Sequence, residues 1–373
     1  MKVCIVSLNI VPLFGGGQFG GAEVQANFVG RALAACGQHV SMVVSNLPQP
    51  DVIPFPAHNA FDSSQGVRGL RFFHPRWTGV MSALERANAE VYFQHCPGMV
   101  TGLTARYCRR AGKVFVYGAG SDADFSPHPV GVHGMRDKLL FGYGLNACDG
   151  FVVQNEVQRT AAQKRFDRPM RVIPTGIWPI EDAADSQGGA VVWIGGMWKI
   201  KRPGLFLELA RRIPHRRFQL IGDGGDLEAE TRAGAKRLHN VEMLGRLGRE
   251  DVDRVLRRAA LLVNTSSVEG FPNAFLEAWN HGLPVVTFRD IDGIIQGADV
   301  GAVCSSIEEM ADTIQTMLDD VARLRGIRGR ALALVRERYS PQVLGPQYVE
   351  FFEELRQSTD TSAMGAGVVT RSV

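Results

Sequence analysis

The stretch 261–288 most constrains the fold, because it predicts one complete strand, helix and strand unit. Its first part, 261–263, is a short apolar run typical of a buried parallel strand, and a polar, glycine-containing turn follows. Pro272 suits the first position of a helix, where its missing N–H costs nothing. Gly282 then ends the helix, with a proline and a second apolar run just beyond it. The stretch therefore predicts a βαβ unit of a parallel sheet.

The start of this helix is suited to bind an anion. The amides of Phe271, Asn273 and Ala274 are expected to point outward together with the positive end of the helix dipole. Glu269 and Glu277 bracket the same helix start, and their carboxylates would repel phosphate but accept hydrogen bonds from hydroxyl groups. A nucleotide sugar satisfies both conditions, with its phosphates on the amides and its sugar rings on the carboxylates.

In this context the two glutamates, separated by seven residues, resemble the donor-site signature of the retaining GT-B glycosyltransferases of family 4 (glycosyl transferases group 1). The resemblance implies an α/β fold of two Rossmann-like parallel-sheet domains facing a cleft. It also implies that Glu269 contacts the hydroxyls of the transferred sugar and that Glu277 holds the ribose of the nucleotide. The alternative is that Glu269 only ends a loop and that Glu277 lies on a solvated helix face, the commoner fate of a single glutamate.

Length and composition agree with a two-domain enzyme. A chain of 373 residues exceeds what one hydrophobic core usually supports. A net charge of +3 with 21% charged residues calls for no nucleic-acid partner. The chain has no apolar run long enough for a transmembrane helix, and its first residues lead directly into a strand, unlike a signal peptide. Its six cysteines show no C-x-x-C spacing, which indicates buried free thiols in a reducing compartment, and we expect a cytoplasmic protein.

Short apolar runs alternate with helical patterns along the chain, as in parallel sheets covered by helices. Strands are expected at 3–7, 40–44, 91–93, 114–117, 150–153 and 172–173 in a first set, and at 191–194, 218–221, 241–244, 261–263 and 285–287 in a second. The predicted organisation is an N-terminal domain at 1–178 that binds the acceptor, a linker at 179–189, a C-terminal domain at 190–340 that binds the nucleotide sugar, a helix at 341–357 and a disordered tail at 358–373. By resemblance alone, the helix at 341–357 returns to the N-terminal domain.

A second donor-binding element follows the strand at 191–194. It is a glycine-rich turn, Gly195 and Gly196, followed by the cations Lys199, Lys201 and Arg202. In family 4 this segment usually reads Gly-Arg with a lysine a few residues later, and both cations bind the phosphates. Lys201 matches that lysine, whereas Gly196 stands where the arginine usually does. Either Lys199 or Arg202 supplies the second charge, or phosphate stabilisation is weaker than usual; the alternative is a set of solvent-facing charges.

Two further glycine turns fit the resemblance. Gly222 follows the strand at 218–221, in a turn whose backbone lies close to the nucleotide in the family. Near the N-terminus, Gly20 and Gly21 with Glu23 resemble the Gly-Gly-x-Glu loop of family 4. The glycines at 15, 17 and 20 also match G-x-G-x-x-G, the signature of a dinucleotide-binding fold. A long loop in place of a tight turn, and no acidic residue after the second strand, count against it.

His95 follows the strand at 91–93, at a place where family members often carry a histidine near the cleft, although a lone histidine is more often structural. The strand at 114–117 lacks the histidine that commonly follows it in the family. Asp122 and Asp124 mimic a D-x-D metal signature, but carboxylates at that spacing hold a cation only if further oxygens converge. We expect neither a bound metal nor a cofactor, with the nucleotide sugar as co-substrate.

The sequence therefore predicts a retaining, hexosyltransferase-type enzyme of polysaccharide biosynthesis, which moves a sugar from a nucleotide diphosphate donor to a glycan, lipid-linked or small-molecule acceptor. The expected catalytic residues are Glu269, Lys201 and His95. The expected donor-binding residues are Gly20, Gly21, Gly195, Gly196, Lys199, Lys201, Gly222, Gly270, Phe271, Asn273, Ala274 and Glu277. A non-catalytic nucleotide-sugar binder and an NAD-dependent oxidoreductase remain alternatives. The basic stretch 106–113 leaves open a peripheral contact with the inner membrane face, although a solvated helix end explains it as well.

Overall fold

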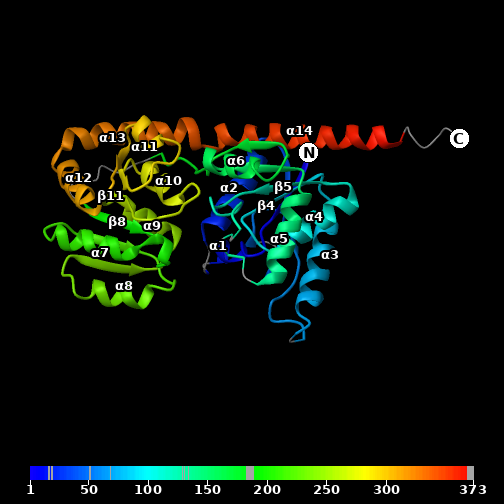
Figure 1. Cartoon of the computed structure of the whole chain (residues 1–373), viewed down its shortest axis with the longest axis horizontal. Coiled ribbons are helices and arrows are strands. Elements are labelled where there is room, and N and C mark those ends of the chain that lie inside the picture. Colours follow the sequence, from blue (N-terminus) through cyan, green and yellow to red (C-terminus); the bar gives the residue numbers. More distant parts are fainter. Residues whose placement is uncertain are drawn as a thin grey trace. The chain divides into compact units, whose positions relative to one another are not determined.

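The computed structural model of the chain describes residues 1–15, 17, 20–49, 52–67, 69–127, 129, 131–132, 134–181 and 189–367, with side chains up to residue 359. The chain divides into two compact units (Figure 1). Unit 1 contains Met1–Gly176 and the chain from Pro341 onward, and unit 2 is Ile177–Ser340. Most of the predicted linker, from 182 to 188, lies outside the described residues. Among the described residues, every helix is too short or too polar to cross a membrane.

Unit 1 contains a seven-stranded parallel sheet in the order β3-β2-β1-β4-β5-β6-β7. Its strands are β1 Lys2–Val6, β2 His39–Val44, β3 Ala57–Asn59, β4 Val91–His95, β5 Val114–Gly118, β6 Gly150–Val153 and β7 Met170–Val172. Its helices are α1 Val11–Gly15, α2 Gly21–Ala35, α3 Thr78–Ala87, α4 Met99–Ala111, α5 Met135–Ala147, α6 Glu156–Gln163 and α14 Pro341–Gly367. A further helical segment, Phe72–Trp77, leads into α3.

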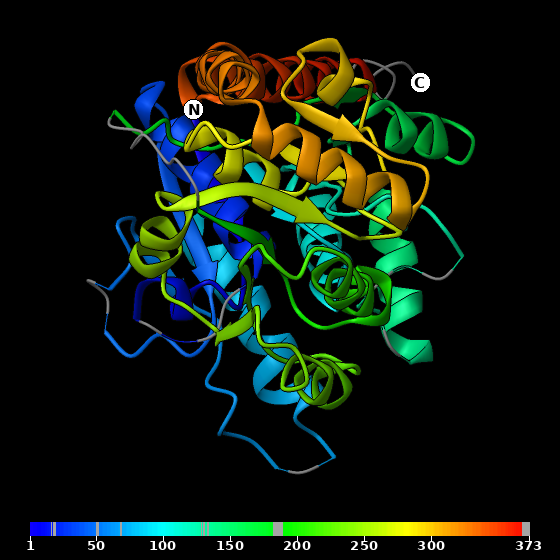
Figure 2. The ribbon, with the colours of Figure 1, turned by 90° about the vertical axis from the view of Figure 1, so that its left-hand side faces the viewer.

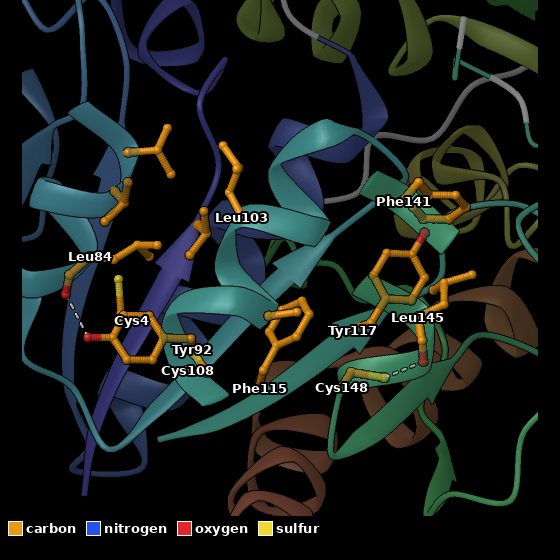
Figure 3. Close-up of a cluster of buried hydrophobic side chains, with 14 of the residues drawn as sticks. Cys4, Leu84, Tyr92, Leu103, Cys108, Phe115, Tyr117, Phe141, Leu145 and Cys148 are labelled. Atoms are coloured by element: carbon orange, nitrogen blue, oxygen red, sulfur yellow. Dashed lines mark hydrogen bonds between the residues drawn. The ribbon is translucent and has the colours of Figure 1, made fainter. Parts of the chain in front are cut away.

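The core of unit 1 explains why its strands read as continuous apolar runs. Side chains of β1, β4 and β5 pack against α3, α4 and α5, so both the strands and the helices bury apolar atoms (Figure 3). The one polar group of Tyr92 is satisfied because its hydroxyl donates to the carbonyl of Leu84 at 2.7 Å. All six cysteines are free, as predicted, and burial raises the pKa of the Cys4 thiol to about 12.

Helix α14 packs within unit 1, against α2 and β5. Its side chains Phe351 and Leu355 lie so close to Gly150 of β6 that a Cβ there would come within 2.7 Å of Leu355 Cδ1. The helix continues past residue 357 to Gly367, so residues 358–367 of the expected disordered tail are helical, and 368–373 lie outside the described residues.

Unit 2 contains a six-stranded parallel sheet in the order β10-β9-β8-β11-β12-β13, with helices on both faces (Figures 1 and 2). Its strands are β8 Ala190–Ile194, β9 Phe218–Ile221, β10 Val241–Gly245, β11 Ala259–Asn264, β12 Val285–Thr287 and β13 Gly301–Val303. Its helices are α7 Pro203–Arg212, α8 Glu228–Ala235, α9 Arg249–Leu256, α10 Asn273–Asn280, α11 Ile294–Gly297, α12 Ile307–Asp319 and α13 Val321–Leu334. The prediction of two Rossmann-like parallel sheets is confirmed, and it missed only the short strands β3 and β13.

Candidate functional site

The strand order of unit 2 marks one position at the edge of its sheet. From β8 the chain builds outward through β9 to β10, and it then returns to the other side of β8 with β11. The sheet order therefore reverses between β8 and β11. In open α/β sheets, ligands bind in the crevice outside the carboxyl ends of the strands at such a point. The loops that leave β8 and β11 there are the two segments that the sequence predicts to bind a donor.

An ion pair joins these two loops. Lys201 Nζ lies 2.6 Å from Glu269 Oε1, and the side chains are 26% and 11% exposed. The side-chain amide of Asn264, the last residue of β11, donates to the same oxygen at 3.2 Å. The second carboxylate oxygen of Glu269 accepts no hydrogen bond from the described part of the chain. Glu269 is thus held through one carboxylate oxygen, while the other oxygen can accept a hydrogen bond from a hydroxyl group.

A buried set of hydrogen bonds holds the two loops in register. The hydroxyl of Thr265, which is fully buried, accepts from Trp193 Nε1 at 3.0 Å and donates to the carbonyl of Lys201 at 2.7 Å. Ser267 in turn donates its amide to the carbonyl of Ile200 at 2.8 Å. Because unsatisfied buried donors are costly, these bonds fix the backbone beneath Lys201 and Glu269.

Arg202 braces the same pair of loops. Its backbone is left-handed, with φ of 50°, and its guanidinium donates to the carbonyls of Thr265 at 2.6 Å and Ser266 at 3.2 Å. The guanidinium also lies 5.0 Å from the ring centroid of Phe288, and burial lowers the pKa of Arg202. Arg202 is therefore engaged with protein groups.

Lys199 is exposed, and its ammonium forms no ion pair with the described residues. Its backbone amide donates to Asp226 Oδ1 at 2.9 Å. Gly196, at the position of the family's arginine, lies under Trp198, since a Cβ there would be 2.7 Å from Trp198 Nε1. Of the two cations that the sequence left as candidates for the second charge, Lys199 is the one whose side chain is not already engaged.

The turn after β9 packs against the turn after β8, which contains Gly195 and Gly196. Gly222 has φ of 130°, and a Cβ there would lie 2.0 Å from the carbonyl oxygen of Gly195. Its amide donates to the carbonyl of Gly245 at 2.7 Å. The amide of Met197 donates to the carbonyl of Gly224 at 2.7 Å. Only glycine permits this close approach, so the backbones of Gly222 and Gly195 lie in direct contact.

Helix α10 lies where the sequence predicts it, but it is one residue shorter at each end, because Pro272 is its N-cap rather than its first residue and His281 is its C-cap. Asn273 and Ala274 open the helix. Phe271, in the turn before it, places its ring in the core, with its centroid 5.1 Å from that of Tyr339. The helix therefore starts at the carboxyl edge of the sheet, beside the loop that carries Glu269.

Glu277 lies one turn into α10 and is partly buried. Desolvation raises the pKa of its carboxyl from 4.5 to about 7, and the nearby Arg249 partly opposes this rise. Its carboxyl accepts no hydrogen bond from the described residues. In the free protein the carboxyl therefore lacks hydrogen-bond donors among the described residues that would stabilise its charged form.

In unit 1 the order of strands reverses between β1 and β4, and the residues predicted there lie at the carboxyl ends of these strands. Gly20 is the N-cap of α2, which begins at Gly21, and its amide donates to Glu23 Oε2 at 2.8 Å. His95 ends β4, and burial lowers the pKa of its imidazole to about 4, so it is neutral near neutral pH.

The first glycine motif of the chain does not have the layout of a dinucleotide-binding turn. Helix α1 lies between β1 and Gly17, and residues 16, 18 and 19 of the motif lie outside the described residues. In the dinucleotide motif the glycine turn follows the strand directly. The segment between β1 and the glycines therefore counts against the oxidoreductase alternative in the structure, as it does in the sequence.

Asp122 and Asp124 bind different protein groups. Asp122 accepts from the side-chain amides of Asn155 at 2.9 Å and Gln158 at 3.2 Å. Asp124 is buried and accepts from the hydroxyl of Tyr117 and the amide of Gly120, both at 2.8 Å. Burial raises the pKa of Asp124 to about 6. Within the described residues there is no cluster of three His, Cys, Asp or Glu side chains arranged for a metal.

Sequence reasoning missed Asn264, Thr265 and Trp193 as parts of the unit 2 site. A usable signal was present for two of them, because Asn264 and Thr265 are polar residues that directly follow an apolar run predicted to be a buried strand. Trp193 gave no such signal, since an aromatic residue in a buried strand is ordinary.

Residues 188–320 match the family model described as Glycosyl transferases group 1. The Vi polysaccharide biosynthesis protein VipC/TviE of Salmonella typhi is 32% identical over 129 residues, which are 32% of this chain and 22% of that protein. A glycosyltransferase of Haemophilus influenzae, described as uncharacterized, is 23% identical over 190 residues, 47% of this chain and 53% of its own length. Each match therefore spans less than two thirds of the relative.

Anabaena Alr3699/HepE, solved in complex with UDP and glucose, is similar in structure with a TM-score of 0.72 at 18% identity. The similarity covers 95% of this chain and 100% of that chain. Together with the two parallel sheets, it confirms the predicted GT-B fold class.

Proposed function

We propose that the protein is a nucleotide-sugar-dependent glycosyltransferase, because residues 188–320 match the glycosyl transferases group 1 family model. The observation that carries the proposal is the Lys201–Glu269 ion pair at the reversal point of the unit 2 sheet. It sets a cation and a carboxylate side by side, next to the start of α10. A diphosphate needs the first of these groups, and sugar hydroxyls need the second.

In the proposed donor complex, the diphosphate takes the place of Glu269 as the partner of Lys201. Glu269 stays bonded to Asn264 and turns its remaining acceptor capacity to the sugar hydroxyls. The amides of Asn273 and Ala274 contribute the positive end of the α10 dipole. Glu277 accepts the ribose hydroxyls, which supply the hydrogen bonds that its carboxylate lacks in the free protein.

We propose that the anomeric configuration is retained. The bond between the anomeric carbon and the phosphate oxygen breaks, and the acceptor hydroxyl oxygen bonds to the same face of that carbon. The departing diphosphate takes the acceptor proton, and Lys201 with Lys199 stabilises its charge. His95, neutral in the free protein, orients the acceptor in unit 1 as a hydrogen-bonding group. No metal takes part in this scheme.

The proposed donor base is uridine, because the solved structure of similar fold holds UDP. The proposed acceptor is a glycan or a lipid-linked carbohydrate, by analogy with a relative named for polysaccharide biosynthesis. A proton NMR time course of the transferred sugar's anomeric signal tests retention, since an inverted product contradicts the scheme.

Titration calorimetry with UDP, GDP, ADP and NAD tests the donor site, using wild type, Glu277→Ala, Lys201→Ala and the control Lys236→Ala. Lys236 is an exposed cation of unit 2 without an ion pair among the described residues. Binding of one nucleoside diphosphate, weakened by the first two substitutions and not by the third, supports the proposal. Tight NAD binding that neither substitution changes would overturn it, and donor binding with no transfer or hydrolysis would leave a non-catalytic binder.

A further inference from the structure

Unit 1 exposes an unusual amount of apolar side chain at one place. Of the nine large apolar side chains that are exposed among the described residues, six lie in two segments, the chain before α3 and the first turns of α5. These six form what we call the apolar patch: Val67, Leu70, Phe73, Met135, Leu139 and Tyr143. Phe73, Met135 and Leu139 are 62%, 80% and 68% exposed. Apolar surface gathered in this way marks an interaction site more often than scattered exposed residues do.

The two segments form one surface, although about sixty residues separate them in the sequence. The guanidinium of Arg136 in α5 lies 4.2 Å from the ring centroid of Phe72, next to Phe73. The starts of α3 and α5 accordingly lie at the same end of unit 1 (Figure 1). Met135, Leu139 and Tyr143 are four residues apart and share one face of α5.

The opposite face of α5 packs into the hydrophobic core of unit 1, so the exposed patch residues are not the residues that anchor this helix. Phe141, Gly144 and Leu145 are buried. Gly102 of α4 allows close packing there, because a Cβ at Gly102 would lie 2.3 Å from the carbonyl oxygen of Leu140. Helix α5 is thus apolar on two faces, only one of which the protein covers.

Cations accompany the patch. Arg71 and Lys138 are exposed, and neither side chain forms an ion pair with the described residues. Arg76, three residues after Phe73 of the patch, likewise has no carboxylate partner among them, and its guanidinium lies 5.9 Å from the ring centroid of Phe61. Arg136 pairs with Asp137, the acidic residue of α5. A surface with exposed apolar side chains and unpaired cations complements a bilayer, whose acyl chains are apolar and whose anionic headgroups are negative.

We propose that the apolar patch of unit 1 docks the protein on an anionic lipid bilayer. Phe73, Met135 and Leu139 enter the boundary between headgroups and acyl chains, and Arg71 and Lys138 contact the headgroups. The patch consists of other residues than the basic stretch 106–113 that the sequence singled out, although Arg106 of that stretch approaches it, with its guanidinium 5.9 Å from the ring centroid of Trp77. The inference rests on the surface of unit 1 alone and does not depend on the proposed catalysis.

Sedimentation of the full chain with vesicles tests the proposal, using phosphatidylcholine alone or mixed with phosphatidylglycerol, and without any sugar donor. We expect binding to the mixed vesicles that weakens as salt is raised. Met135→Asp with Leu139→Asp should weaken binding by roughly tenfold per residue, and Arg71→Gln with Lys138→Gln by about fivefold per residue.

Matched controls make the assay specific to the patch. Val157→Asp places a charge at another exposed apolar position of unit 1, and Lys236→Gln removes an exposed cation of unit 2. Both should bind like wild type, and all variants should keep the thermal unfolding midpoint because the altered side chains are exposed. Absence of vesicle binding overturns the proposal. The proposal is also overturned if Arg109→Gln with Arg110→Gln abolishes vesicle binding while the patch substitutions leave it unchanged. It is overturned as well if the wild-type protein is an oligomer in solution and the patch substitutions dissociate it.

Discussion

Replacing Glu277 by glutamine should stabilise the free protein at alkaline pH while it weakens donor binding. Desolvation raises the pKa of this carboxyl from 4.5 to about 7, which corresponds to about 3 kcal/mol of preference for the neutral form in the folded state. Glutamine has nearly the same shape but never ionises. The folded protein therefore no longer has to hold a poorly solvated negative charge.

The direction of the pH effect follows from proton binding. Between about 4.5 and about 7 the folded state holds the Glu277 proton more tightly than the unfolded state, so this contribution to stability is complete below 4.5 and is lost as the pH rises through 7. Wild type should lose about 2 to 3 kcal/mol of unfolding free energy through this group between about pH 5 and about pH 8. Glu277→Gln should lose none of that amount.

Urea unfolding followed by tryptophan fluorescence measures the difference, since Trp193 and Trp279 are buried in unit 2. Glu230→Gln is the matched control, because Glu230 is exposed and forms no ion pair with the described residues. A stability difference between wild type and Glu277→Gln that is the same at both pH values would refute the argument. In calorimetry, UDP binding to wild type should release protons at about pH 6 to 7, as ribose hydroxyls favour the ionised carboxylate, and this release should be absent in the variant.

Three further substitutions test the parts of the unit 2 site separately. Lys201→Met should weaken the calorimetric affinity for UDP by about 10- to 100-fold, because a charged hydrogen bond is lost, whereas Lys236→Met should not; equal affinities would contradict the phosphate role. Thr265→Val leaves Trp193 Nε1 without its partner and should cost about 1 to 3 kcal/mol in urea unfolding, with Thr265→Ser restoring most of it. Gly222→Ala places a Cβ against the Gly195 carbonyl oxygen at a φ of 130°, so it should destabilise unit 2 by roughly 2 to 4 kcal/mol. The control Gly224→Ala should cost about 1 kcal/mol, because Gly224 also has a positive φ but no atom of the described residues beyond its neighbours in the chain lies within 4 Å of a Cβ there. Equal effects of the two alanines would show that the contact is not the cause.

The periodicity of the sequence was sufficient to predict most of the fold. Every predicted strand is present, because strands buried on both faces of a parallel sheet are continuous apolar runs. The strands β3 and β13 were missed because both are three residues long and pair with only one neighbour at the edge of a sheet. Ala57–Asn59 carries almost no apolar side chain, so no pattern distinguishes it from a loop.

Spacing and resemblance also led to the predictions for Glu269, Glu277 and Lys201, but they could not predict which protein groups hold these side chains. The Lys201–Glu269 pair depends on β8 and β11 being neighbours, although 68 residues separate the two side chains. Thr265 bonds to Lys201 and Trp193 only once that pairing exists. Such contacts follow from the order of strands, which apolar runs do not specify.

The glycine at position 196 is explained by its surroundings. Arg202, the nearest arginine, adopts a left-handed backbone that turns its guanidinium toward the carbonyls of Thr265 and Ser266, so it fastens the β8 loop to the β11 loop. The indole of Trp198 occupies the space in which a side chain at 196 would begin. Lys199 is then the exposed cation beside Lys201 that has no carboxylate partner among the described residues. The ammonium of a lysine is a compact charge, whereas the guanidinium of an arginine is planar and can donate two parallel hydrogen bonds. Lys199 therefore supplies the positive charge but not the bidentate hydrogen bonding of an arginine. The proposed phosphate site therefore relies on charge and on the α10 amides more than on bidentate geometry.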